Sequence, residues 1–449
     1  MPSDAQGSTL QPRRVRFETY GCTTNLGDTR TMEGILASRG HTLVGAEEDA
    51  DVVVVNTCTV VDTTEERMED RIAALRAEGK EIVVAGCMAA AQPDEVRRHA
   101  PDAPLLSPRH LHHIDAVVEG RPFTPEYRPK SGLPRAYGPT DAVIQVSEGC
   151  LFTCSYCITK HARGDQTSYP IDDIVQDVRD AVHAGAIDIK ITSQDTSGFG
   201  FDTGRDPDAS LPGLVRRITE IGRPGDFRLR VGMMHPRTAN EHLDALLDAM
   251  DHPNVYKFLH LPIQTGSERI LKAMARGHTI DQFWDTIEAY RARFPTGWVS
   301  TDIICAFPGE TERDHQATLE LLRRLKPEHV NITRFSARPG TPAKTLTGRV
   351  DTAVAKQRSK GATNLVWSMW DTLHKKRIGD HVEVFVTEPG KKEESVLGRG
   401  PNCEPVIIRR SEEEVPLGTR LVVEIVDAKT TYFIGEPRSG AVPVGRRRG

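Results

Sequence analysis

Short apolar runs alternate with amphipathic stretches along the first 120 residues. The β-branched and aromatic content of three runs predicts strands at 15–21, 51–57 and 81–86. The amphipathic stretches between them stop at Gly40 and Gly79, which is typical of helix ends. Alternating strands and helices with short loops indicate a parallel sheet covered by helices. We therefore expect an N-terminal α/β domain at residues 14–120.

The same alternation resumes after a stretch with five prolines and no hydrophobic period, residues 120–140, which we interpret as a linker. Further strands are predicted at 142–147, 188–194, 227–233, 256–263, 299–307 and 329–335. Six strand–helix units fit a partly closed barrel, since a complete barrel of this type has eight. The stretch 351–377 predicts a long closing helix, so the second domain spans 141–376.

The end of the chain has a different pattern. Short apolar runs separated by turn residues recur at roughly even spacing between 381 and 436. Such a pattern is typical of a small all-β barrel, which we expect at 378–437.

Composition narrows the class of protein. Hydrophobic residues make up 38% of the 449 residues, and no apolar run reaches the about 18 residues that a membrane span needs. The polar N-terminus lacks the apolar segment of a secretory signal, so we expect a cytoplasmic protein without membrane contact. Because cytoplasmic thiols stay reduced, the eight cysteines indicate metal or redox chemistry. The net charge of −5 gives no global signal for nucleic acid.

Cys150, Cys154 and Cys157 form a C-x3-C-x2-C loop directly after the first strand of the predicted barrel. Barrel enzymes place their active sites at this end of their strands, and thiolates hold iron–sulfur clusters. Three thiolates leave one iron of a 4Fe-4S cube open, so a molecule with an amine and a carboxylate can chelate it. Two alternatives stay open: a structural zinc site completed by His161, and buried thiols without a ligand.

Three more cysteines, Cys22, Cys58 and Cys87, each follow one of the first three predicted strands. The carboxyl ends of parallel strands meet at one edge of the sheet, so these thiols can converge without a local motif. The alternative is three unrelated core cysteines. We interpret the polar neighbours as a loop rim instead of a core: Thr23, Thr24, Asn25, Asn56 and Thr57.

The loop "GCLFTCSYC" resembles the signature of radical S-adenosylmethionine (SAM) enzymes, with Tyr156 as the aromatic residue before the third cysteine. The resemblance makes Tyr156 an expected contact to SAM. Together with the second set of cysteines, the chain resembles the methylthiotransferase family over residues 14–437. The resemblance implies an N-terminal cluster domain, a partial (β/α)6 radical SAM barrel and a C-terminal TRAM barrel, which is similar to oligonucleotide-binding barrels. It also implies SAM and two 4Fe-4S clusters as cofactors, and a ferredoxin- or flavodoxin-like electron donor. In that family, the loop cysteines are catalytic and the cluster at the other three cysteines delivers sulfur.

The resemblance also suggests contacts to SAM. Ser193, Gln194 and Asp195 follow the second barrel strand, where the superfamily binds the amino group of SAM. An ordinary polar turn is the alternative. His260 and Gln264 end the fourth strand, near the expected ribose, although His260 fits a core histidine equally well.

The family has several branches. "KHARGDQTSYP" and "HPNVYKFLH" resemble the archaeal and eukaryotic branch, which methylthiolates carbon 2 of N6-threonylcarbamoyladenosine next to the anticodon of tRNA. Alternatives are isopentenyladenosine in tRNA, an aspartate of a ribosomal protein, or a zinc-stabilised RNA-binding protein without enzymatic activity. Basic residues near the tail are compatible with phosphate contacts to tRNA: Lys375, Lys376, Arg377, Arg409, Arg410 and Arg446 to Arg448.

Overall fold

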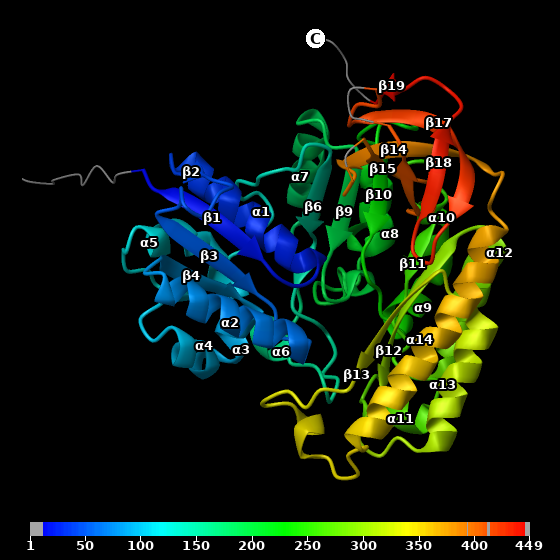
Figure 1. The fold of residues 1–449 in the computed structure, drawn as a ribbon, viewed down its shortest axis with the longest axis horizontal. Helices are drawn as coiled ribbons and strands as arrows, with labels where there is room; N and C mark the ends of the chain where they lie inside the picture. Colours follow the sequence, from blue (N-terminus) through cyan, green and yellow to red (C-terminus); the bar gives the residue numbers. More distant parts are fainter. Residues whose placement is uncertain (1–11, 393, 411–413, 445–449) are drawn as a thin grey trace, which may run out of the picture. The chain divides into compact units, whose positions relative to one another are not determined.

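Figure 1 shows the computed structural model, which describes residues 12–392, 394–410 and 414–444. The chain divides into two compact units. Unit 1 comprises the described residues up to Ala136 together with His161–Arg163, and unit 2 comprises Tyr137–Lys160 and the described residues from Gly164 onward. Within the described ranges, no helix combines the length and apolar character needed to cross a membrane. The basic residues Arg446 to Arg448 lie outside the described residues.

Unit 1 contains a five-stranded parallel sheet with the order β2-β1-β3-β4-β5. Its strands are β1 (Arg14–Thr19), β2 (Thr42–Leu43), β3 (Val52–Thr57), β4 (Glu81–Gly86) and β5 (Leu105–Leu106). Its helices are α1 (Thr23–Ser38), α2 (Asp62–Ala77), α3 (Cys87–Ala91), α4 (Pro93–His99) and α5 (Ile114–Val118). The predicted parallel sheet is confirmed, with two short edge strands in addition.

Helices cover both faces of this sheet. Val52 and Val54 of β3 join a core with α1 and α5, whereas Val53 and Val55 join a separate core with α2 and α4. Successive side chains of a strand point to opposite faces, so a strand buried on both sides is an uninterrupted apolar run. This explains why β3 reads "VVVV" in the sequence.

The proline-rich stretch after α5 has no helix and no strand, but it is not a free linker. Up to Ala136 it belongs to unit 1. The ammonium group of Lys130 is buried and lies 2.6 Å from a carboxylate oxygen of Asp28 on α1. The backbone of Arg135 crosses α1 at Gly34, where an added Cβ would lie 2.4 Å from the Arg135 Cα. The stretch is therefore a strap fixed to α1.

Unit 2 begins with six parallel strands in chain order, which form a half-barrel (Figure 1). They are β6 (Asp141–Gln145), β9 (Asp188–Thr192), β10 (Arg228–Val231), β11 (Phe258–His260), β12 (Trp298–Cys305) and β13 (His329–Arg334). The two halves meet between β10 and β11, where the Tyr256 amide donates to the Leu229 carbonyl at 2.9 Å. The predicted partial barrel of six strands is thus confirmed.

Helices connect these strands, as the sequence pattern predicted. They are α7 (Ile171–His183), α8 (Leu211–Thr219), α9 (Pro236–Glu241), α10 (Leu243–Met250), α11 (Glu268–Ala273), α12 (Ile280–Arg293) and α13 (Glu312–Leu325). The long closing helix is α14 (Thr352–Lys375). An Asp351 side chain caps its amino end by accepting from the amides of Ala353 and Val354.

The remainder of unit 2 is a closed five-stranded barrel, consistent with TRAM. Its strands are β14 (His381–Pro389), β15 (Val396–Arg399), β16 (Pro405–Ile408), β17 (Thr419–Ala428) and β18 (Phe433–Pro437), with β19 (Val442–Pro443) beside β17. Pairing of β14 with both β15 and β17 closes the barrel. Closure leaves none of the five strands with an open edge.

This small barrel packs against the amino ends of the half-barrel strands. Tyr256, Phe258 and Trp298 share one hydrophobic core with residues of the small barrel such as Phe433. The Arg228 guanidinium lies over the Phe385 ring at 4.3 Å and donates to the Glu383 carboxylate at 3.2 Å. The carboxyl ends of the half-barrel strands therefore remain for a ligand site.

Candidate active site

A hairpin-like pair of short strands holds the C-x3-C-x2-C loop at the carboxyl end of β6. The strands are β7 (Ser147–Glu148) and β8 (Thr167–Ser168), and α6 (Thr159–Arg163) lies between them. Gly149 has a φ of +75°, and a Cβ there would lie 2.2 Å from the Asp165 carbonyl oxygen. Only glycine permits this close approach, so the residue before Cys150 closes the base of the loop.

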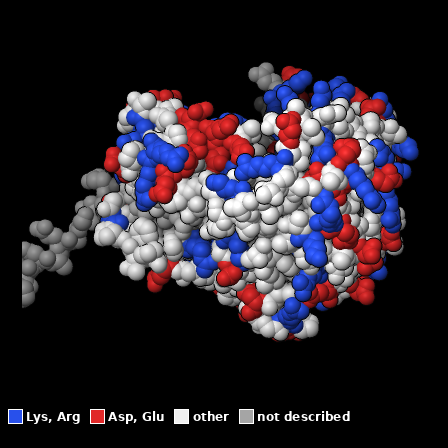
Figure 2. Space-filling model, turned by 90° about the horizontal axis from the view of Figure 1, so that it is seen from below, with Lys and Arg blue, Asp and Glu red and all other residues white. Residues whose placement is uncertain are grey.

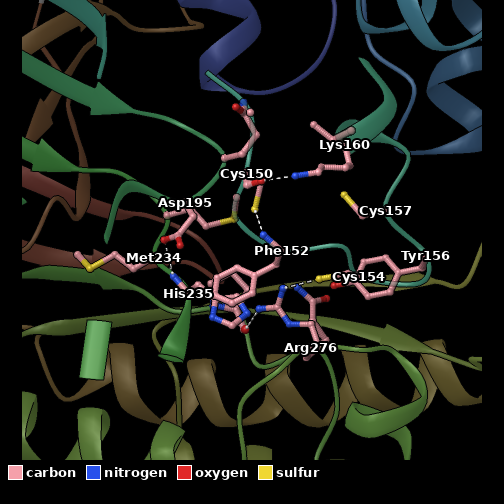
Figure 3. Close-up of a pocket in the computed structure, with 16 residues that line it drawn as sticks. Cys150, Phe152, Cys154, Tyr156, Cys157, Lys160, Asp195, Met234, His235 and Arg276 are labelled. Atoms are coloured by element: carbon pink, nitrogen blue, oxygen red, sulfur yellow. Dashed lines mark hydrogen bonds between the residues drawn. The ribbon is translucent and has the colours of Figure 1, made fainter. Parts of the chain in front are cut away.

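The three loop thiols surround one space in Figure 3. They line a cavity of about 170 Å³. Burial raises the pKa of the Cys150 thiol to about 12 and also raises that of Cys157, so both are protonated at neutral pH until a metal displaces the proton. Their sulfur atoms are not all within 4.8 Å of one another, unlike the ligands of a single ion.

Four of the six predicted SAM contacts also line this cavity: Tyr156, Gln194, Asp195 and Gln264. Asp195 is held from three sides, by the hydroxyl groups of Ser197 and Thr238 at 2.7 and 2.8 Å and by a backbone amide at 3.0 Å. Burial raises the pKa of its carboxyl group.

The other two predicted contacts do not line the cavity. Ser193 is buried, and its hydroxyl lies 3.5 Å from that of Thr196. The His260 ring lies 3.2 Å from the Asp302 carboxylate on the neighbouring strand β12. Four of the six predicted side chains thus line the cavity at the cysteine loop, whereas Ser193 and His260 do not.

Sequence reasoning missed several cavity residues. Met233, Met234 and His235 follow β10, so the strand-end rule that located the cysteines also applies to them. His235 stacks on Phe152 with a centroid distance of 3.8 Å (Figure 3). Arg276 gives no comparable signal, because it lies in a turn between α11 and α12 and not at a strand end.

The cavity is suited to a ligand with both apolar and polar parts. Phe152, Pro262 and the two methionines supply apolar walls. Three buried side-chain atoms on its wall have no hydrogen-bond partner among the described residues: Gln194 Oε1, His235 Nε2 and Arg276 Nε. Buried polar groups without a partner are costly, so they indicate where a ligand binds. SAM, with its amino acid, ribose and adenine, fits this combination.

The second set of cysteines lies at the edge of the unit 1 sheet, as predicted. Cys58 and Cys87 directly follow β3 and β4, and Cys22 follows β1 by three residues. These three strands are neighbours in the sheet. Gly21 has a φ of +116°, and its Cβ would lie 2.9 Å from the Cβ of Cys58. This close approach brings the ends of β1 and β3 together. Burial, with the neighbouring Cys22 and Cys58, raises the pKa of Cys87 to about 12.

The prediction that the five polar residues beside these cysteines form a loop rim is wrong for four of them. Thr24, Asn25, Asn56 and Thr57 are buried. The Asn56 amide donates to the Asn25 carbonyl at 2.8 Å, and the Asn25 amide donates to the Thr57 carbonyl at 2.9 Å. These bonds tie the end of β3 to α1. Polar side chains therefore occur here because they fix the backbone that carries the cysteines.

The remaining thiols lie elsewhere. Cys305 on β12 is 1% exposed and Cys403 is 7% exposed in the core beneath the small barrel. Among the described residues, the one group with ligand atoms close enough for a single ion is Glu69, Glu95 and His99. These side chains are partly exposed and carry no further sign of a ligand.

Comparisons with known proteins agree with this arrangement. Residues 14–107 match a family described as "Uncharacterized protein family UPF0004", and residues 144–322 match the Radical SAM superfamily. The radical SAM methyltransferase TsrM from Kitasatospora setae, solved with cobalamin and a [4Fe-4S] cluster, has a similar fold. It shows a TM-score of 0.54 at 16% identity, covering 74% of this chain and 77% of that one.

Relatives extend over nearly the whole chain. A probable threonylcarbamoyladenosine tRNA methylthiotransferase of Archaeoglobus fulgidus is 40% identical, covering 94% of this chain and 98% of that protein. A threonylcarbamoyladenosine tRNA methylthiotransferase of Danio rerio is 33% identical, covering 95% and 78%. The fold and the cysteine loop define a radical SAM protein. More particularly, the chain belongs to the threonylcarbamoyladenosine tRNA methylthiotransferase family.

Proposed function

We propose that this protein methylthiolates carbon 2 of N6-threonylcarbamoyladenosine next to the anticodon of tRNA, by a radical SAM mechanism. The observation that carries this proposal is a pair of three-cysteine sets in a member of this family: one set lies in the loop after β6, and the other lies at the carboxyl ends of β1, β3 and β4. One set lies in each unit. Methylthiolation needs two functions, activation of a C–H bond and delivery of sulfur, and two sets of ligands provide for both.

We assign the SAM-binding cluster to Cys150, Cys154 and Cys157. A 4Fe-4S cluster held there would supply, together with SAM, the radical chemistry that activates the C–H bond at carbon 2 of the adenine. Gln194, Asp195 and Gln264 line the cavity beside the ligand, and the hydrogen bonds to Asp195 fix its orientation. The apolar walls exclude water, which protects a reactive radical from side reactions.

We assign the second 4Fe-4S cluster to Cys22, Cys58 and Cys87, and with it the supply of sulfur; a second SAM provides the methyl group. We further propose that a ferredoxin- or flavodoxin-like protein supplies electrons and that the enzyme acts in the cytoplasm. As functional domains we retain 14–120, 141–376 and 378–437. The hydrophobic core that joins the last two supports treating them as one folding unit.

Nucleoside analysis tests the proposal. In a strain that lacks the gene, mass spectrometry of tRNA nucleosides is expected to show unmodified threonylcarbamoyladenosine, and the methylthio form is expected to return when this chain is expressed. Anaerobically purified protein is expected to contain about eight irons, four for each cluster. If the product that returns is methylthiolated isopentenyladenosine or a methylthiolated ribosomal protein, the assigned substrate is wrong. If the purified protein is colourless and contains zinc, the proposal that it is a radical SAM enzyme is wrong.

A further inference from the structure

Between β13 and α14, unit 2 has a groove of about 300 Å³ that the assigned roles above do not use. Val330, Asn331, Ile332 and Thr333 of β13 form one wall, and Thr363, Val366, Trp367 and Trp370 of α14 form the other. β13 is the last strand of the half-barrel and pairs only with β12 within the described residues. The groove therefore follows an open edge of the half-barrel.

The two tryptophans of the groove have different surroundings. Trp370 is 4% exposed, and its indole N–H donates to the Pro327 carbonyl at 2.7 Å, so it is a fixed part of the wall. Trp367 is 53% exposed, more than any other tryptophan, tyrosine or phenylalanine among the described residues. A large aromatic ring held on a rigid helix at the mouth of a groove is suited to stacking on another flat ring.

Positive charges accompany this ring. Lys356 and Lys360 precede Trp367 by eleven and seven residues on α14, which places all three on one side of the helix. Arg334 ends β13 on the other side of the groove. All three cations are exposed, and none forms an ion pair with a described residue. Figure 2 shows Lys and Arg side chains among acidic ones over much of the face that it views.

We propose that this groove binds a single-stranded segment of the tRNA substrate, with one nucleobase stacked on Trp367 and phosphates beside Lys356, Lys360 and Arg334. Protein recognition of single-stranded RNA relies on aromatic stacking and on cations that track the backbone. The groove runs along β13, whose carboxyl end lies on the side of the SAM cavity and whose amino end lies toward the small barrel. The groove therefore extends between the side of the SAM cavity and the side of the small barrel, along a line that one RNA strand can follow. This proposal rests on the proposed function, since it takes tRNA to be the substrate.

Binding of tRNA that carries threonylcarbamoyladenosine to the full-length, cluster-loaded protein tests the groove. Trp367→Ala is expected to raise the Kd about fivefold to a hundredfold, the effect of losing one stacked base. Trp367→Phe keeps a ring and is expected to recover most of the affinity. Lys356→Glu with Lys360→Glu is expected to flatten the dependence of affinity on salt. Trp284 on α12, whose ring is covered by Arg324 of α13, gives the matched control: Trp284→Ala is expected to bind as the unaltered protein does.

Three results would contradict the proposal that this groove binds RNA. One is unaltered tRNA affinity of Trp367→Ala, which would leave the proposed function intact. Another is an equal loss in the Trp284→Ala control. The third is a concentration-dependent dimer that Trp367→Ala abolishes, which would make a second copy of the chain the occupant. By contrast, failure of the unaltered protein to bind tRNA would contradict the proposed function as well.

A second, independent observation concerns Arg276. Its side chain is buried, its Nη1 lies 3.6 Å from the Cys154 sulfur and its Nη2 donates to the Pro262 carbonyl at 3.0 Å (Figure 3). A cation with an N–H directed at a cysteine ligand stabilises the added electron of a reduced cluster. We infer that Arg276 is a positioning residue that raises the reduction potential of the cluster held by Cys150, Cys154 and Cys157.

Potentiometry with detection by electron paramagnetic resonance tests this role without turnover. Arg276→Met is expected to shift the midpoint potential of the SAM-responsive signal to more negative values. At a fixed potential the ratio of reduced to oxidised cluster is expected to fall about tenfold, which is 59 mV for one electron. Arg276→Lys keeps the charge and is expected to recover part of the shift. Lys272→Met on α11 is the control, because this lysine is exposed. An unshifted potential in Arg276→Met with full iron content would exclude the role.

Discussion

Replacing Cys150, Cys154 or Cys157 with alanine is expected to abolish reductive cleavage of SAM while the protein keeps about half of its iron. The reason is that the two cysteine sets belong to different units, each with its own hydrophobic core. Losing a thiolate of the loop removes a ligand of one cluster and leaves the core around the other set intact. The measurements are 5′-deoxyadenosine formation under dithionite and iron per chain in anaerobically purified protein.

Cys305→Ala is the control for this experiment. Cys305 is more deeply buried than the three loop thiols, but it lies on β12 and not on the cavity wall. Its loss is expected to cost a modest amount of stability, about 1 kcal/mol, and to leave 5′-deoxyadenosine formation in place. If a loop variant still forms 5′-deoxyadenosine, the SAM-cleaving cluster has been assigned to the wrong cysteines. If each loop variant loses all of its iron, the two sites are not separable.

The positions of both cysteine sets could be predicted because they depend on a rule of parallel sheets and not on local spacing alone. Val52 to Val55 form an apolar run that indicates a strand buried on both faces, and the residue after such a strand lies at the ligand edge. Gln194 and Asp195 also follow a strand, β9, but their prediction as SAM contacts comes from the family resemblance. The strand-end rule also holds for Met233 and His235, which follow β10 and line the cavity.

Other features depend on contacts that no pattern in one segment encodes. Arg276 reaches the cavity from a turn between two helices, so its position follows from the packing of α11 against the barrel. Lys130 lies in a stretch with the composition of a linker, yet it is buried because Asp28 on α1 provides its counter-charge. Likewise, the apolar residues Phe258 and Trp298 fit any barrel strand, and only the structure shows that the small barrel covers them.

The second large effect is expected at the other cysteine set. Cys22→Ala, Cys58→Ala and Cys87→Ala are each expected to abolish methylthiolation of tRNA while 5′-deoxyadenosine still forms. These thiols lie at the ends of β1, β3 and β4 in unit 1, and none of them lines the SAM cavity. Mass spectrometry of the tRNA nucleosides and of the SAM products measures both reactions in one sample.

Equal behaviour of the three variants is the decisive part of this prediction, because their surroundings differ. Cys22 is exposed, whereas Cys58 and Cys87 are 7% and 3% exposed. If the three were unrelated thiols, Cys22→Ala would be nearly silent, and the two buried variants would lose stability by unequal, mostly modest amounts. If they hold one cluster, the exposed cysteine matters as much as the buried ones, since each thiolate binds a different iron of the same cube. Full methylthiolation by Cys22→Ala would therefore remove that cysteine from the cluster and contradict the convergence of the three strand ends on a common ligand.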